Sequence, residues 1–228
     1  MANVRRIKSI GLSNFQSFAT SSFAMMAVYH RHGRCDNMFD MYSESPSVKD
    51  SERMRGVTRK PVDLCIVEPH TTKDMDTFWP SKLDKSLLKK FIYSHIKSNT
   101  PLENQYPTVI GQIANEGQYG HCVSICDETE EPCPHLTSAL DEADLRVLLH
   151  VDDWAKNEYT KCIVLSSDTD VIVALLYHMQ TFAKHDLQEL WVRAGVGDKT
   201  RYLPLHNLYK TLGHQFRGVT LRLYVTLV

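Results

Sequence analysis

Short apolar runs that do not alternate with polar residues most constrain the fold of this chain. In the C-terminal half, the apolar run Cys162–Leu165 is followed by an almost wholly apolar helical segment, Asp170–Gln180, and by a second apolar run, Leu187–Val192. Strands without alternation are typically buried on both faces, and two of them joined by a helix form a parallel βαβ unit. We therefore expect an α/β fold with a mostly parallel central sheet between two helical layers.

The rest of the chain extends this pattern. We expect an N-terminal helical segment in residues 1–34, packed on an α/β domain that covers residues 35–228. Glycine, proline and acidic residues dominate the segment near 115–136, which predicts a flexible loop. The remaining expected strands are Met38–Tyr42, Val62–Val67 and Val109–Ile113, and an amphipathic helix is expected at Ser81–Lys97. A further helix should be capped by Thr137 or Ser138, carry Asp141 and Glu142 in its first turn and run to about Lys156.

Composition and charge exclude several classes of protein. The 228 residues carry 26 basic and 27 acidic side chains, and this net charge of −1 provides no overall attraction to nucleic acid or to anionic membranes. The longest apolar runs, Phe23–Tyr29 and Val171–Tyr177, are too short to cross a bilayer. No apolar signal-peptide core follows the basic N-terminus, and the six cysteines are unevenly spaced, which indicates reduced thiols. We expect an intracellular protein of the nucleus or cytoplasm with no membrane partner.

Two carboxylates follow the strand expected at Cys162–Leu165. Asp168 and Asp170 stand where α/β sheets bind their ligands, beyond the carboxyl end of a strand. They would repel each other unless a divalent cation bound by oxygen offset their charge. The structural alternative is that Asp168 caps the helix while Asp170 lies in its first turn. A cap explains one aspartate more easily than it explains two.

A third acid falls on an apolar helix face. Asp144 belongs to the helix that is expected to run to about Lys156. At 100° per residue it lies beside Val151 and Ala155, on the face that this helix should bury. A lone buried carboxylate costs several kcal/mol unless it is paired, protonated or bound to a metal. A salt bridge with Arg146 or Lys156, or a position at a helix end that still contacts water, is the alternative and stays open.

The acids and their neighbours resemble the motifs of the PIN-like and flap-endonuclease superfamily. Glu142-Ala143-Asp144 stands at a helix start, some two dozen residues before a strand that leads into Asp168-Thr169-Asp170. The chain is more closely similar to uncharacterised animal proteins with a PIN-like domain, for which a mobile-element origin is conceivable. Those proteins usually have a glutamate at the position of Asp141. The similarity covers most of residues 35–212 and rests on Asp141–Arg146, Leu149-His150, Ser167–Val171, Leu190-Trp191 and Arg201–His206, and more weakly on Phe39–Tyr42, Ser47–Lys49, Arg53–Gly56 and Lys85–Phe91.

This resemblance implies a three-layer PIN-like domain that hydrolyses phosphodiester bonds in DNA or RNA with one or two Mg²⁺ or Mn²⁺ ions. Paired metals lower the pKa of an attacking water and stabilise charge on the scissile phosphate. Lys49, Arg53 and Arg55 are candidates for phosphate contacts, although a solvated charged face is the simpler interpretation. The implied metal ligands, of which the last four would also be the catalytic residues, are Asp40, Glu142, Asp144, Asp168 and Asp170.

The C-terminal sequence departs from that family. Family members continue past the helix at His206–Leu212 into a further strand and a last acidic motif, whereas Asp198 is the last acid of this chain. We expect the chain to be truncated near its C-terminus, or read there in another frame, and to lack one ligand. The departure affects the expected activity more than the expected fold. A degenerate PIN-like module that binds nucleic acid or protein without catalysis is therefore the main alternative.

Two other chemistries have weaker support. Asp168-Thr169-Asp170 also resembles the Asp-x-Asp motif of haloacid-dehalogenase-type phosphatases, but the 228 − 170 = 58 residues that follow leave too little chain for that family's other motifs. The segment 121–135 holds three cysteines and two histidines, yet their spacing matches no standard zinc pair. Buried or loop thiols explain that segment more simply.

Overall fold

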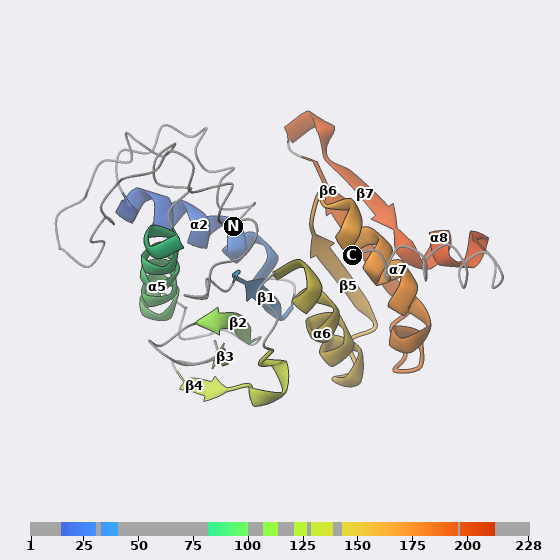
Figure 1. Ribbon diagram of the computed structural model, residues 1–228, viewed down its shortest axis with the longest axis horizontal. Coiled ribbons are helices and arrows are strands. Elements are labelled where there is room, and N and C mark those ends of the chain that lie inside the picture. Colours follow the sequence, from blue (N-terminus) through green and yellow to red (C-terminus); the bar gives the residue numbers. More distant parts are fainter. Residues whose placement is uncertain are drawn as a thin grey trace. The chain divides into compact units, whose positions relative to one another are not determined.

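The computed structural model describes residues 15–30, 33–40, 82–99, 107–113, 121–126, 129–138, 143–195 and 197–212. The chain divides into two compact units, Met1–Glu142 and Ala143–Val228, each with its own sheet and helices (Figure 1). The mixed α/β class is confirmed, but the described strands form two small sheets instead of a single one. No helix in the described part of the chain is long and apolar enough to cross a membrane.

The sheet of the first unit has four strands in the order β1-β2-β3-β4. β1 (Cys35–Met38) runs parallel to β2 (Thr108–Ile113), while β3 (His121–Cys126) and β4 (Thr129–Pro132) continue the sheet in antiparallel fashion. The position of β2 confirms its prediction to within one residue. β1 begins three residues earlier than expected, so Asp40 follows the strand instead of lying in it.

The β3–β4 hairpin corrects the prediction of a flexible loop near residues 115–136. Val123 and Ile125 alternate along β3 and are buried in the core, whereas all four residues of β4 are exposed. Two buried apolar positions and the pairing of both strands outweigh the acidic composition of the segment. A 3-10 turn, η2 (Pro134–Leu136), follows the hairpin and buries Leu136.

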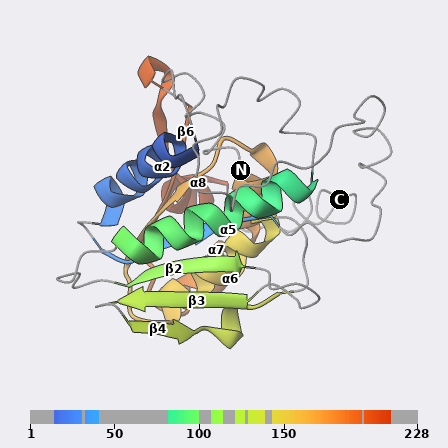
Figure 2. The ribbon, with the colours of Figure 1, turned by 90° about the vertical axis from the view of Figure 1, so that its left-hand side faces the viewer.

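Two helices pack on one face of this sheet. α5 (Lys82–Asn99) confirms the predicted amphipathic helix, and α2 (Phe15–His30) confirms that the N-terminal segment contains a helix. α5 lies over β2 and packs against α2, as Figure 2 shows. The buried side chains of this core are Phe15, Phe39, Leu88, Ile92, Ile96, Ile110, Val123 and Ile125.

The second unit contains the predicted βαβ unit. Its elements, in chain order, are α6 (Ala143–Lys156), β5 (Lys161–Leu165), α7 (Thr169–Ala183), β6 (Glu189–Ala194), the 3-10 turn η3 (Gly197–Lys199), β7 (Arg201–Pro204) and α8 (Leu205–Thr211). β5 and β6 pair in parallel around the crossover helix α7, and β7 adds to β6 in antiparallel fashion. α6 packs against α7, and residues 139–142, where the expected helix would begin, lie outside the described residues.

The sheet of the second unit buries alternate residues. Along β5, Cys162 and Val164 are buried while Ile163 is 50% exposed, and β6 alternates between buried and half-buried positions. We expected strands covered on both faces. The period of two shows instead that one face of this sheet is packed and the other is open to solvent at Ile163. A run of apolar letters does not distinguish these cases, because it does not show which face a neighbour covers.

Candidate carboxylate site

The predicted site residues lie in both units. Asp168 and Asp170 stand at the start of α7 and Asp144 at the start of α6, in the second unit. Asp40 follows β1 in the first unit. Four predicted site residues lie outside the described residues: Glu142, Lys49, Arg53 and Arg55. The strand expected at 62–67 also lies outside them.

Asp168 is the N-cap of α7. Its backbone is extended, and its Oδ1 accepts a hydrogen bond of 2.9 Å from the backbone N–H of Asp170. The hydroxyl of Ser166 in turn accepts a hydrogen bond of 3.1 Å from the backbone N–H of Asp168. The capping role weighed for Asp168 is therefore confirmed. The cap engages one oxygen of the carboxylate, and both Asp168 and Asp170 remain exposed to solvent.

The carboxyl ends of β5 and β6 are tied together beside these acids. Ser167 follows β5, and its hydroxyl accepts a hydrogen bond of 3.2 Å from the backbone N–H of Gly195, the residue directly after β6. Because β5 and β6 are parallel, both carboxyl ends lie at the same edge of the sheet. Asp168 and Asp170 thus stand at the edge where α/β folds bind ligands.

Asp144 is exposed, which corrects the expectation that it lies within the buried face of α6. Val151 lies two turns further along at nearly the same angle and is buried. Asp144 differs because it belongs to the first turn, at the end of the helix. Burial depends on where the neighbouring elements end as well as on the angle around the helix. The exposure of Asp144 in the first turn agrees with the helix-end alternative.

α6 buries polar side chains that the sequence analysis missed. Arg146 is fully buried, His150 is 2% exposed and Asp153 is 9% exposed, whereas Leu145 and Leu149 are 41% and 38% exposed. The three polar residues recur at intervals of four and three, which is the spacing of one helix face. That spacing was the available signal. Buried polar side chains are generally hydrogen-bonded, so this face of α6 packs through polar groups as well as apolar ones.

In the first unit, a buried lysine contacts the segment that carries Asp40. Lys89 is fully buried on α5, and its Nζ donates a hydrogen bond of 3.3 Å to the backbone carbonyl of Asp40. Lys85, one turn earlier on the same helix, is 2% exposed. Both lysines fall at helical spacing within the apolar stripe of α5, a signal that the sequence analysis did not use. Asp40 itself is half-buried and follows the carboxyl end of a parallel strand pair.

A buried ion pair lies at the start of β1. Arg34 Nε and Asp36 Oδ1 are 2.7 Å apart, and Arg34 Nη2 donates a second hydrogen bond of 2.8 Å to Asp36 Oδ2. Both side chains are less than a tenth exposed.

The thiol of Cys35, between these two residues, has a raised pKa. Burial, followed by the charge of Asp36, raises the pKa of the Cys35 thiol to about 11, although a hydrogen bond from Asn37 opposes the shift. Cys35 therefore remains a thiol, which is the unreactive form.

The described acids have the donor chemistry of a hard-cation site. Carboxylate oxygens are the ligands that Mg²⁺ and Mn²⁺ prefer, and Asp168 and Asp170 present theirs to solvent at the β5–β6 edge. Within the described part of the chain, no three His, Cys, Asp or Glu side chains are grouped closely enough to hold a metal ion. Glu142, one of the implied ligands, lies outside that part.

Comparison with protein-family models, with curated proteins and with solved structures finds no match for this chain. Its function is therefore inferred from its own residues and their geometry.

Proposed function

We propose that this chain is a metal-dependent nuclease-like protein of the PIN-like type, which hydrolyses phosphodiester bonds in DNA or RNA. The observation that carries the proposal is the exposed pair Asp168 and Asp170 at the carboxyl edge of the parallel strands β5 and β6. Open α/β sheets bind ligands at this edge. Two carboxylates two residues apart repel each other and are well suited to a hard divalent cation.

Asp168 and Asp170 would hold Mg²⁺ or Mn²⁺ with oxygen ligands. When bound, one or two such ions would supply a Lewis acid that lowers the pKa of a water and neutralises charge on the phosphate. The chain itself positions the acids: the cap bond orients Asp168, and the bond between Ser167 and Gly195 holds the two strand ends together. The family resemblance implies three further ligands: Asp40, Glu142 and Asp144.

The proposal includes the three-layer PIN-like arrangement with a mostly parallel sheet. Its support is one parallel strand pair in each unit, β1 with β2 and β5 with β6, each followed by a predicted ligand at a carboxyl strand end. The substrate would be nucleic acid, held through local basic residues because the net charge is close to zero. The residues proposed for phosphate contacts are Lys49, Arg53 and Arg55.

A PIN-like module without catalysis is the second candidate, and the cap bond of Asp168 favours it. That bond provides a structural reason for one of the two aspartates without any metal. Such a module would bind nucleic acid or protein. The phosphatase alternative gains no such support, because β5 ends at Leu165 and Asp168 comes three residues later, whereas that motif needs its first aspartate directly at the strand end.

Cleavage of an end-labelled flap duplex, single-stranded DNA and single-stranded RNA in Mn²⁺ tests the proposal. The proteins compared are the parent chain, the Asp168→Asn/Asp170→Asn double variant and Asp186→Asn. Asp186 is an exposed acid beyond the opposite end of α7, and its left-handed backbone suits asparagine. Cutting by the parent and by Asp186→Asn, but not by the folded double variant, supports a nuclease. A folded parent that cuts none of the three substrates supports the second candidate.

A further inference from the structure

We propose that Cys122 and Cys133 form a reversible disulfide bond, which makes the β3–β4 hairpin a site of thiol modification. The proposal rests on the hairpin alone and is independent of the proposed nuclease activity.

The register of the hairpin places the two cysteines opposite each other. Val123 pairs with Pro132 in antiparallel fashion, so the next position pairs Cys122 with Cys133. The backbone N–H of Cys133 donates a hydrogen bond of 2.8 Å to the carbonyl of Cys122. Residues in such a hydrogen-bonded pair have Cα atoms about 5.5 Å apart. Disulfides span Cα separations of roughly 4.4–6.8 Å, so the backbone spacing allows the bond.

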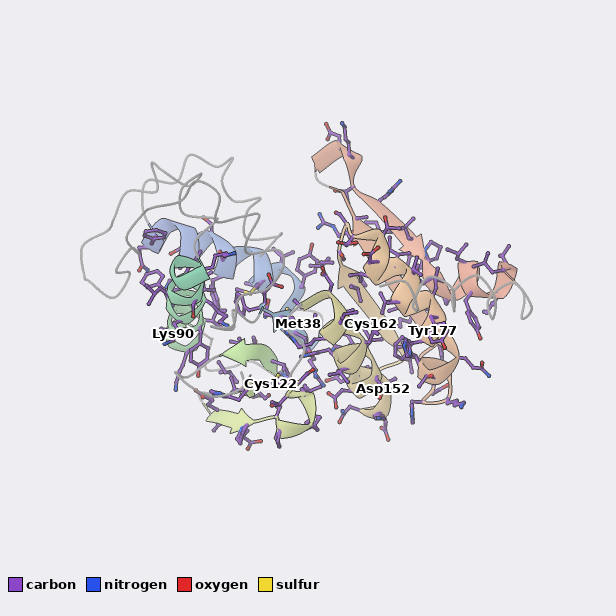
Figure 3. The ribbon with its side chains drawn as sticks, viewed as in Figure 1. Met38, Lys90, Cys122, Asp152, Cys162 and Tyr177 are labelled. Carbon is purple, nitrogen blue, oxygen red and sulfur yellow. The ribbon has the colours of Figure 1, made fainter. Side chains whose placement is uncertain are left out.

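Both side chains lie on the same face of the sheet. Directly opposite residues of an antiparallel pair point to the same side, and Cys133 packs against a small cluster formed by Val109, Cys122 and Leu136. Cys122 is fully buried in this cluster, whereas Cys133 is half-buried. Figure 3 marks Cys122 within the first sheet. An oxidant in solution therefore reaches Cys133 first, and Cys122 is the neighbour that can resolve the product.

The geometry favours a reversible bond over a permanent one. Opposite Cβ atoms in a hydrogen-bonded pair are about 5.5 Å apart, which exceeds the roughly 3.5–4.5 Å of a relaxed disulfide. Closing the bond has to draw the two strands together locally, and strained disulfides are more readily reduced. Oxidation also removes the hydrogen bond of 3.2 Å that Cys122 Sγ donates to the carbonyl of Leu136.

The oxidant of this step is glutathione disulfide. Cys133 loses its proton to solvent, and its thiolate attacks one sulfur of glutathione disulfide; a mixed disulfide forms, and the glutathione thiolate that leaves takes up a proton. Cys122 then attacks the Cys133 sulfur while its proton passes to the departing glutathione sulfur, which leaves as the second glutathione thiol. Two protein thiols are thereby oxidised to one disulfide, and one glutathione disulfide is reduced to two thiols.

Cys126 provides a matched control in the same hairpin. It lies four residues along β3 from Cys122, on the same face, and pairs with Thr129 instead of a cysteine. At about 3.3 Å per residue, its backbone is about 13 Å from that of Cys122. Cys126 is therefore too far along the hairpin to bond with Cys133 while the strands remain paired.

The test maps disulfides in the reduced full chain after incubation with glutathione disulfide, with the remaining thiols blocked by N-ethylmaleimide before digestion. We expect a cross-linked peptide joining Cys122 to Cys133 in the parent and in Cys126→Ser, absent in Cys133→Ser, and lost on treatment with dithiothreitol. A stable glutathione adduct on Cys133 without the cross-link, or a link from either cysteine to a different one, overturns the proposal. The map of the parent decides the outcome even if Cys133→Ser fails to fold.

Discussion

The Nζ of Lys89 and the backbone carbonyl of Asp40 are joined by a hydrogen bond of 3.3 Å across 49 residues of sequence, although Lys89 has no exposed surface. A buried ammonium is costly unless hydrogen bonds replace its hydration. The burial of Lys89 and the position of the Asp40 backbone therefore depend on each other. The bond ties α5 to the chain that leaves β1, which is the segment that carries a proposed metal ligand.

Replacing Lys89 should destabilise the first unit. We expect Lys89→Ala to lower the free energy of unfolding by about 2–4 kcal/mol, because it removes buried methylene groups and the donor to the Asp40 carbonyl. Lys97→Ala on the same helix is the control, since Lys97 forms a surface ion pair with Glu130 and its side chain is 54% exposed. That control should cost less than about 1 kcal/mol. Urea denaturation measures both, and equal losses would contradict the structural role of Lys89.

Substitutions at Asp168 should separate capping from metal binding. Asp168→Ala removes the acceptor for the Asp170 N–H and should lower the free energy of unfolding by about 0.5–2 kcal/mol. Asp168→Asn keeps an acceptor oxygen and should cost less than Asp168→Ala. Under the proposed function, both variants should weaken Mn²⁺ binding, measured by calorimetry, because both remove the charge. If Asp168→Asn and Asp168→Ala lower the free energy of unfolding equally, the cap bond is not the stabilising feature.

The chain between β6 and β7 should tolerate alanine at one glycine better than at the other. Gly195 has a φ of +84°, and a Cβ there would collide with the backbone carbonyl of Lys199; Gly197 has a φ of +55° and open space around it. Gly197→Ala should therefore cost about 1–2 kcal/mol for its left-handed backbone alone. Gly195→Ala should cost more, because the turn that leads into β7 has to move. Thermal unfolding of the two variants tests this order. Equal melting temperatures for Gly195→Ala and Gly197→Ala would contradict it.

The stability of the second unit should fall as the pH is lowered through 6.5. Burial lowers the pKa of His178 from its ordinary value of 6.5, although the charge of Asp152 opposes the shift. Below 6.5 the unfolded chain binds a proton at His178 more readily than the folded chain does, so acid favours unfolding. His178→Gln should remove this contribution from a series of urea denaturations across the pH range.

A second histidine should make a separate contribution to the pH dependence. Burial also lowers the pKa of His95 in the first unit, so His95→Gln should remove a separate part of the acid sensitivity. An unchanged pH dependence in His178→Gln would show that its imidazole titrates alike in the folded and unfolded chains.

Local sequence patterns predicted the elements that have a long apolar stripe or an apolar run. The stripe of α5 was predictable because a helix repeats its buried positions every 3.6 residues, and the succession β5–α7–β6 was predictable from its apolar runs and their lengths. The capping role of Asp168 was also among the predicted alternatives, since a cap depends on residues only two apart. The β3–β4 hairpin was missed because its strands are short and its second strand is wholly exposed and acidic.

The sequence by itself thus determined the α/β class, the βαβ unit and the acids that follow β5. Only the tertiary structure decided that Asp144 is exposed, that Lys89 is buried against Asp40, and that Cys122 faces Cys133. The physical reason is the same in each case. Burial and pairing depend on where a neighbouring element begins and ends, and that neighbour lies at a distance along the chain that no local period encodes.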